Sequence, residues 1–473
     1  MTITGQTLLD LGYKPGSWFK PAIAAAERAR TAGGDEAAIR AAIEAQMPPP
    51  TIPLRAFGAL PFGMNIRAEN AEEAENIASV EKHMARLMQL PTVKAGAVMP
   101  DACSSSYSPG TIPVGGIIAA ENAIHPGMHS ADICCSMAVT MFSGEIEPAK
   151  IMDAGMAHSH FGFGGRALAD RMELPAGLLV QFEANTFLRP LIQAATEHFG
   201  TQGDGNHFFY VGRVASSGRL ALVTHHGSRK PGALLYKAGM LAAERLRRQL
   251  SPETPEHNAW LIADSTEGAA YWQALQLIRA WTKASHYAIH DRVASVIGLT
   301  VEDRFWNEHN FVFQRADGLF YHAKGATPAF PDYASDATGL TLIPLNMAEP
   351  ILIARGLNAA SGLGFAPHGA GRNYSRSAYI RRHAGKTEAD MMREQTAGLD
   401  VRFYCGIPDM SELPGAYKPA ATVRAQIAEY GLADIVDTIQ PLGSIMAGDW
   451  QRDAPWKKQP KVAATIADES SPV

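Results

Sequence analysis

Five short motifs, far apart in the chain, carry the residue types from which metal sites and nucleophiles are built. They are Asp132-Ile133-Cys134-Cys135, Gly205-Asn206-His207-Phe208, His225-His226-Gly227-Ser228-Arg229, His309-Asn310 and His368-Gly369-Ala370-Gly371-Arg372. Four of the five place a histidine beside Gly, Asn or Arg. Glycine lets the backbone approach a ligand, and Asn and Arg bind phosphate or orient a neighbour. The set therefore favours a metal-assisted phosphoryl-transfer site.

The composition limits the size and the charge of what the chain can build. With 473 residues and 46% hydrophobic side chains, the chain can bury a large core in one big domain or two. The 43 Gly and 30 Pro residues fit a loop-rich α/β or α+β enzyme. The formal net charge of −5 excludes a bulk polycation, so any contact with nucleic acid must lie in a local groove.

Cysteine usage and hydropathy indicate the compartment. Two of the four cysteines, Cys134 and Cys135, are adjacent, which suits a disulfide framework badly. A reduced, cytoplasmic protein is therefore expected, with one thiolate free to bind metal. The N-terminus has no basic region followed by an apolar one, and no apolar run reaches about 18 residues. We therefore expect neither secretion nor insertion into a membrane.

The chain is expected to have three parts. Residues 1–50 are predicted to form a helical appendage, with alanine-rich helices over 23–30 and 35–46. Residues 51–448 are predicted to form one mixed α/β (α+β) catalytic domain, because no linker clearly divides them. Residues 449–473 are a polar tail that we expect to be disordered.

Local patterns place the elements of the expected catalytic domain. A strand is expected to start at 51–54, and helices are predicted over 69–90, 235–249 and 269–297. A small hairpin is expected around Asp317-Gly318, between strands at 311–314 and 319–322. The remaining short apolar strands, which alternate with glycine-rich loops, cover 94–99, 137–142, 208–214 and 220–224.

The first two motifs each allow a structural and a functional interpretation. Asp132 and Cys135 can converge on one cation, or on two that share the sulfur, whereas the alternative is a buried cysteine pair and a turn-forming aspartate. The glycine-rich turn over 200–205 presents Asn206 and His207 at a strand entrance, where sites are often built. The alternative there is a plain turn with a capping asparagine.

The next motifs are weaker when each is taken alone. The loop that holds His225, His226 and Arg229 offers backbone N–H groups, a hydroxyl and a guanidinium, which suit an anion, with a histidine ligand alongside. One of its two histidines can equally be solvated. His309 fits a hydrogen-bonded structural histidine at least as well as a ligand, and Lys324 fits a surface lysine on a tight loop.

The segment from His368 to Arg372 is the most specific of the five. Its two glycines let the backbone close against phosphate, and Arg372 can neutralise charge, with Arg376 one helical turn further on. His368 can be a metal ligand or a covalent nucleophile that attacks phosphorus. The structural alternative is a glycine-rich turn that caps a helix.

These motifs, in this order, resemble those of the RtcB family of RNA ligases, the 3′-phosphate/5′-hydroxyl tRNA-splicing ligases. The similarity runs roughly over residues 52–448. The resemblance implies a distinctive α/β fold, one catalytic domain with a central metal-binding cleft, two Mn²⁺ ions and GTP as cofactor. It also implies that a histidine takes GMP from GTP and passes it to an RNA 3′-phosphate (or 2′,3′-cyclic phosphate) end, where a 5′-hydroxyl end displaces it.

The family's functional residues have counterparts here. Asp132 and Cys135 match its aspartate and bridging cysteine, and its three metal-binding histidines match His207, His225 and His309. His368 matches the guanylylated histidine, and the expected nucleotide site also includes Asn206, Gly369, Ala370 and Gly371. Two cations in such a site can hold the phosphates and offset charge as the imidazole attacks in line.

The sequence departs from the family around the base of the nucleotide. Tyr210 stands where the family has a glutamate near the nucleoside, and Asp101-Ala102-Cys103 stands for Asp-x-His. Pro344-Leu345-Asn346-Met347-Ala348 replaces Pro-Gly-Ser-Met-Gly, and Met446 or Ala447 replaces a lysine that contacts guanine. We therefore expect an intact metal site beside a rebuilt guanine pocket.

The sequence thus predicts a Mn²⁺-dependent RNA ligase that acts through a nucleotide on His368. Its expected partners are a nucleoside triphosphate and RNA with 3′-phosphate and 5′-hydroxyl ends. Because the net charge is −5, RNA must follow a local basic path, for which we nominate Arg229, Lys324, Arg372 and Arg376. The alternatives are a metal-dependent RNA phosphodiesterase or phosphatase that has lost guanylylation, and a non-catalytic protein that binds RNA ends.

Overall fold

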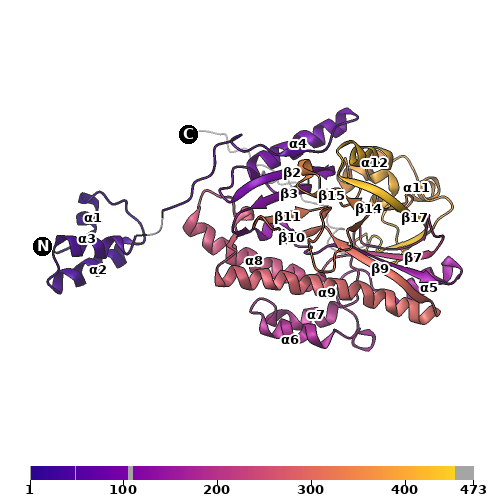
Figure 1. The fold of residues 1–473 in the computed structure, drawn as a ribbon, viewed down its shortest axis with the longest axis horizontal. Helices are drawn as coiled ribbons and strands as arrows, with labels where there is room; N and C mark the ends of the chain where they lie inside the picture. Colours follow the sequence, from indigo (N-terminus) through magenta and orange to yellow (C-terminus); the bar gives the residue numbers. More distant parts are fainter. Residues whose placement is uncertain (1, 48–49, 105–109, 453–473) are drawn as a thin grey trace, which may run out of the picture.

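The computed structural model describes residues 2–47, 50–104 and 110–452 (Figure 1). Two large β-sheets and long helices make up the body of the molecule, so the expected mixed α/β fold is confirmed. Within these ranges no helix is long and apolar enough to span a bilayer. Most of the expected polar tail lies outside the described residues.

Three short helices form the N-terminal part. They are α1 (Gly5–Asp10), α2 (Phe19–Thr31) and α3 (Glu36–Glu44), and in Figure 1 they lie to one side of the sheets. Asp35 caps α3 by accepting from the Ala38 N–H at 2.8 Å. A small core of their own holds them together, formed by Ile3, Leu8, Ala22, Ala26 and Ile43. The helices expected over 23–30 and 35–46 correspond to α2 and α3, and α1 is an additional helix.

The strand expected at 51–54 is wrong. This segment forms no strand: the Ile52 N–H donates to the Leu250 carbonyl at 2.6 Å, and the Ile52 carbonyl accepts from Ser251 Oγ at 2.7 Å. A strand needs a ladder of such bonds with a neighbour, and Pro53 lacks the N–H that a ladder would use.

The first sheet has five strands in the order β1-β2-β3-β11-β10. Helix α4 (Ala71–Leu87) packs Val80, Met84 and Leu87 against it, and Asn70 caps this helix. The expected hairpin is confirmed, because β10 and β11 pair antiparallel and Gly318 takes a positive φ of 79° at the turn. The strand bounds are β1 Gly63–Met64, β2 Val93–Cys103, β3 Val114–Ala120, β10 Asn310–Gln314 and β11 Phe320–Lys324.

The second sheet has eight strands and brings its two ends together. Its order is β13-β14-β17-β6-β7-β5-β9, with β16 beside β17. The Leu342 N–H in β13 donates to the Asn307 side chain in β9 at 2.8 Å, which links the outer strands. The bounds are β5 Ser136–Ser143, β6 Phe208–Val214, β7 Leu220–His226, β9 Thr300–Glu308, β13 Leu340–Ile343, β14 Ile351–Gly356, β16 Asp400–Phe403 and β17 Ala433–Met446. Two further pairs join β4 (Ala123–Ile124) to β8 (Leu261–Ile262) and β12 (Ala326–Pro328) to β15 (Phe365–Pro367).

A long helix covers one side of this sheet, where it contacts β5, β7 and β9. Helix α9 (Thr266–Ile297) begins at the cap Ser265 and ends at Gly298, whose φ is 72°. It runs beside α8 (Arg229–Leu250) along one side of the molecule in Figure 1, with α6 and α7 beyond it. The other helices are α5 Pro148–His158, α6 Ala176–Ala184, α7 Ile192–His198, α10 Arg376–Arg382, α11 Glu388–Gln395 and α12 Ala420–Glu429.

Candidate metal centre and nucleophile

A turn before β5 separates the two adjacent cysteines. Cys134 has a φ of 57°, in the left-handed region, and its N–H donates to the Asn310 carbonyl at 2.7 Å. Its side chain joins the main apolar core, whereas Cys135 faces a group of histidines. One cysteine is therefore a core residue, and the other is available to a site.

The three expected histidine ligands lie where strands of the eight-stranded sheet end. His207 directly precedes β6, His225 lies near the end of β7, and His309 directly follows β9. The strand register brings these ends to one edge, because Phe208 pairs with His225 and Met137 pairs with His225 from the other side. His225 and His309, 84 positions apart in the sequence, thus become neighbours.

The side chains of the five expected metal ligands converge. Sγ of Cys135 lies 3.1 Å from Nε2 of His225 and 3.5 Å from Nε2 of His207. Nε2 of His225 lies 3.2 Å from Nε2 of His309, and Oδ2 of Asp132 lies 3.2 Å from Nε2 of His207. Two trios of donor atoms, each within 4.8 Å of one another, share the sulfur: Cys135, His225 and His309, and Asp132, Cys135 and His207.

Hydrogen bonds at Nδ1 orient two of the histidine rings so that Nε2 of each faces the cluster. Nδ1 of His207 donates to the Gln202 carbonyl at 2.6 Å, and Nδ1 of His225 donates to the Asn206 carbonyl at 3.0 Å. A carbonyl can only accept, so each Nδ1 carries a proton, and each Nε2, which faces the sulfur, is the ring atom left to bind an ion. Burial, with His207 close by, lowers the pKa of His225 to about 3, which keeps the ring neutral.

The donor set fits a divalent cation. Imidazole nitrogens, one carboxylate and one thiol converge at a buried point, and such a mixed set accepts Mn²⁺ or Zn²⁺. Burial opposes the ionisation of Asp132, yet the charge and hydrogen bond of His207 hold the pKa of this carboxyl below its ordinary value. Burial raises the pKa of the Cys135 thiol in the absence of an ion. Metal binding would therefore release the thiol proton.

His368 lies beside this cluster and is held by Asp101. Its ring centroid is 4.8 Å from that of His309. Nδ1 of His368 lies 2.6 Å from Oδ2 of Asp101, and the His368 backbone N–H donates to the same oxygen at 3.2 Å. Gly371 has a φ of 71°, and a Cβ there would stand 1.9 Å from the Asp101 carbonyl oxygen. This glycine is thus required by close packing against the segment that carries Asp101.

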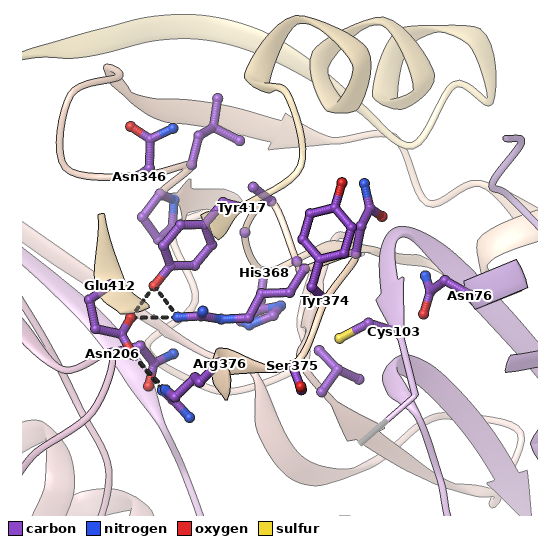
Figure 2. A pocket seen from close by; sticks show the side chains of 18 of the residues that line it. Asn76, Cys103, Asn206, Asn346, His368, Tyr374, Ser375, Arg376, Glu412 and Tyr417 are labelled. Atoms are coloured by element: carbon purple, nitrogen blue, oxygen red, sulfur yellow. Dashed lines mark hydrogen bonds and ion pairs between the residues drawn. The ribbon is translucent and has the colours of Figure 1, made fainter. Parts of the chain in front are cut away.

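A cavity of about 1150 Å³ opens over His368. In Figure 2, Arg376 and Glu412 lie to one side of His368, and Cys103 and Asn76 to the other. The whole of the expected nucleotide site borders this cavity: Asn206, His368, Gly369, Ala370 and Gly371.

The four residues nominated for an RNA path are not all in the cavity wall. Arg372 and Arg376 line it, whereas within the described ranges neither Arg229 nor Lys324 does. Arg229 is buried, donates to the Gly162 carbonyl at 3.3 Å and lies against Gly203. Lys324 donates to the Ile112 carbonyl at 3.2 Å.

A buried carboxylate holds the two arginines of the wall. Oε1 of Glu412 accepts from Arg376 at 2.5 and 2.9 Å, and Oε2 accepts from Arg372 at 2.7 Å and from the Tyr417 hydroxyl (Figure 2). The Glu412 side chain is fully buried, but Arg376 keeps 53% of its side chain exposed. Neither Glu412 nor Asp101 was selected as a site residue from the sequence. The Asp101-Ala102-Cys103 segment could have identified Asp101 from the sequence, whereas no sequence pattern marks Glu412 as a site residue.

Apolar and aromatic side chains also contribute to the cavity wall. They are Phe208, Tyr210, Leu345, Met347 and Met446. The Tyr210 hydroxyl is already used, because it donates to the Ile439 carbonyl at 2.9 Å. The side chains of these five residues can therefore pack against a flat ring but offer few hydrogen bonds to its edge.

Comparisons with known proteins agree with this arrangement. A family model described as "tRNA-splicing ligase RtcB" matches residues 149–447. The protein called "tRNA-splicing ligase RtcB" in Thermococcus kodakarensis is 26% identical over 295 residues, which cover 53% of this chain and 60% of that protein. Its namesake in Pyrococcus abyssi is 25% identical over 326 residues, 60% of this chain and 35% of that protein. The "RNA-splicing ligase RtcB" of Escherichia coli is 24% identical over 399 residues, 77% and 93% of the two chains.

These matches differ in extent. The chain spans less than two thirds of the two archaeal relatives but nearly all of the Escherichia coli protein. The match to the family model covers His207, His225, His309 and His368, whereas Asp132 and Cys135 precede it.

Proposed function

Because this chain belongs to the RtcB family, we propose that it is a metal-dependent RNA ligase. It would join an RNA 3′-phosphate (or 2′,3′-cyclic phosphate) end to a 5′-hydroxyl end. The observation that supports this most directly is the position of His368, whose Nδ1 is held by Asp101 at 2.6 Å while its ring lies 4.8 Å from that of His309. A nucleophile is thus oriented at the edge of a cluster of metal-type donors.

Two divalent cations would be held by the converging side chains, with the Cys135 sulfur shared between them. We propose Mn²⁺, although Zn²⁺ suits the same donors. When bound, the ions would offset the negative charge of phosphate oxygens during transfer. A reducing, cytoplasmic setting fits this use of a thiol, because all four cysteines are free. The five proposed ligands are Asp132, Cys135, His207, His225 and His309.

His368 would carry the nucleotide. Oδ2 of Asp101 accepts a hydrogen bond from Nδ1–H, so the Nε2 lone pair would be free to attack the α-phosphorus of GTP; an N–P bond would form and the bond to pyrophosphate would break. An oxygen of the RNA 3′-phosphate then attacks the same phosphorus and releases His368. Finally the 5′-hydroxyl oxygen attacks the 3′-phosphate phosphorus, loses its proton and displaces GMP. The phosphodiester bond of the joined RNA results.

Cavity residues would position the phosphates. Arg372 and Arg376 present guanidinium groups to the cavity, and Asn206 lies beside His225 at the metal cluster. Gly369 and Ala370 bring backbone close to His368. We propose that Arg229 acts from outside the wall, since its charge helps to keep Asp132 ionised. Lys324, also outside the wall, adds positive charge near Cys103.

A labelling experiment tests the proposal. The protein is incubated with Mn²⁺ and GTP, or separately ATP, labelled at the α-phosphate, and adducts that survive denaturation are counted. We expect an adduct in the wild type and none in His368→Ala, although His368→Ala should still bind metal. An adduct that survives in His368→Ala would show that the nucleophile is another residue. Ligation is then measured with RNA that carries a 3′-phosphate and a 5′-hydroxyl.

One observation favours a second candidate function. The apolar wall around Tyr210, Leu345 and Met446 offers little to a guanine edge, which fits a phosphodiesterase or phosphatase that kept the metal and lost the nucleotide. RNA turnover without any adduct would support that enzyme. Binding of RNA ends with neither adduct nor turnover would support a non-catalytic role.

A further inference from the structure

Behind the metal-type cluster, five fully buried side chains form a continuous hydrogen-bonded chain. Two come from β5, one from β7 and two from α9: Ser136, Thr140, Thr224, His286 and His290. Ser136 Oγ lies 3.0 Å from Nε2 of His286, whose Nδ1 lies 2.7 Å from Thr224 Oγ1. Thr224 Oγ1 lies 2.8 Å from Nε2 of His290, whose Nδ1 lies 2.7 Å from Thr140 Oγ1.

The Cys134 carbonyl at one end of this hydrogen-bonded chain determines which group donates and which accepts in each of its bonds. Ser136 Oγ donates to the Cys134 carbonyl at 3.0 Å, so its oxygen must accept from Nε2–H of His286. Nδ1 of His286 then accepts from Thr224, and Thr224 accepts from Nε2–H of His290. Thr140 donates to the remaining nitrogen of His290. Each bond therefore has one donor and one acceptor, and both imidazoles are neutral.

Burial supports the neutral state of both rings. It lowers the pKa of His290 to about 3 and that of His286 well below the ordinary value. Both ring nitrogens of each histidine are engaged by hydroxyl groups, so neither ring has a lone pair to offer a cation. This hydrogen-bonded chain therefore supports the neighbouring strands and is not a further metal site.

The hydrogen-bonded chain contacts the eight-stranded sheet next to two of the proposed metal ligands. Ser136, the first residue of β5, directly follows Cys135, and Thr224 directly precedes His225 in β7. Successive strand residues point to opposite faces, so the two ligands face the site while their neighbours face α9. His286 contacts both of these neighbours, and it thereby spans β5 and β7 next to the two ligands, whose Sγ and Nε2 atoms are 3.1 Å apart.

We propose that His286 is a positioning residue that sets the separation of the Cys135 sulfur and the His225 nitrogen, and so the affinity and geometry of the metal centre. The inference rests on the proposed metal centre. Supporting hydrogen bonds of metal sites typically change metal affinity by about 10–100-fold when they are removed. We call His286 with its hydrogen bonds to Ser136 and Thr224 the His286 brace. Because this brace acts through the positions of β5 and β7, its loss should alter the geometry of the metal ligands and not only the stability of the protein.

The test compares two buried histidines. His286→Leu removes both bonds of the brace, and His322→Leu is the matched control. His322 is equally buried, but its ring bonds to the backbone of His125 at 2.9 Å and of Phe320 at 3.1 Å. His286→Gln can restore one donor and one acceptor. Metal-free protein is titrated with Co²⁺, whose visible bands report geometry and whose near-ultraviolet band reports thiolate ligation, and urea unfolding is measured in parallel.

We expect both leucine variants to be less stable, but only His286→Leu to bind Co²⁺ at least about tenfold more weakly and with shifted visible bands. His286→Gln should regain most of the affinity. If His286→Leu does not fold, Thr224→Val, which removes the hydroxyl between the two imidazoles, should show the same shift. Wild-type affinity and spectrum in these variants would overturn the brace alone, as would an equal loss of affinity in His322→Leu. A wild-type protein that binds no Co²⁺ would overturn the metal centre and the brace together.

Discussion

Asp101 holds His368 at two points with a single carboxylate oxygen. Oδ2 accepts from Nδ1 of the ring at 2.6 Å and from the backbone N–H of the same residue at 3.2 Å. The ring position, its tautomer and the start of the following loop are thus set together. Asp101 itself is fully buried, which strengthens the electrostatic contribution of its charge.

Asp101→Asn should slow nucleotide transfer to the protein by roughly 10²–10⁴-fold, a range typical of general acid–base and orienting groups. An amide can donate to Nδ1 and so place the proton on Nε2, which blocks attack. Single-turnover labelling gives the rate, and Co²⁺ affinity serves as the control because Asp101 is not a proposed ligand. A wild-type rate in this variant would show that Asp101 does not orient the nucleophile.

Cys135→Ser and Cys134→Ser should have opposite effects. Loss of the Cys135 sulfur should weaken Co²⁺ binding by more than about tenfold and abolish the thiolate band, because both donor trios use it. Cys134 lies in the apolar core, so Cys134→Ser should lower stability and keep the band. Loss of the band in Cys134→Ser, with Cys135→Ser unaffected, would mean that the two cysteines are assigned the wrong way round.

Glu412→Gln should destabilise the protein by about 3–5 kcal/mol, because removal of one partner leaves buried guanidinium charge unpaired. Binding of nucleotide should also weaken, since Arg372 and Arg376 lose their common anchor. Urea unfolding and nucleotide titration measure the two effects. Asp390→Asn breaks an exposed ion pair with Arg393 and should change neither. Equal stability of the two variants would contradict the prediction.

The metal-free protein should lose stability as the pH falls below about 6.5, the ordinary histidine value. Burial lowers the pKa of His125 and of His129 to about 4, so the unfolded chain binds protons in this interval while the native state does not. Each such residue can remove up to about 1.4 kcal/mol of stability per pH unit. His129→Gln should flatten the slope of urea-unfolding free energy between pH 6.5 and 5. Stability that rises as the pH falls would refute the prediction.

We expect weak or no preference for GTP over ATP. The Tyr210 hydroxyl is bound to the Ile439 carbonyl, and Leu345 and Met446 have no side-chain hydrogen bond to give. Unpaired polar groups of a base cost about 1–3 kcal/mol each. Competition between GTP, ATP and inorganic triphosphate in the presence of Mn²⁺ measures the preference. A GTP preference of roughly a hundredfold, or about 2.7 kcal/mol, would contradict the expectation.

The sequence predicted the elements whose patterns are local. The strand expected at 208–214 coincides with β6, those at 94–99, 137–142 and 220–224 lie within β2, β5 and β7, and the helix expected at 69–90 corresponds to α4. Apolar periodicity and caps are sufficient for such elements. The same local patterns placed His207 and His225 at strand ends, and the resemblance to the RtcB family implied that they meet.

Other features depend on partners that are distant in the sequence. Strand β17 runs from Ala433 to Met446 and pairs with β14, β6 and β16, a role that no local pattern reveals. The segment at 51–54 has apolar residues but no strand beside it. Glu412 looks like any other glutamate until the fold places Arg372 and Arg376 around it. Tertiary context therefore decided these cases.

The donors of the metal cluster lie at or beside the ends of strands that are far apart in the sequence. Cys135 directly precedes β5, which must wait for β7 and β9 before its neighbouring strands exist, and the segment with His368 comes later still. A nascent chain on the ribosome therefore has no assembled place for an ion until most of it has been translated. Metal acquisition is then a late step of biosynthesis. Protein made under metal starvation should accumulate folded but unloaded, and it should gain activity when the ion is restored without any new protein synthesis.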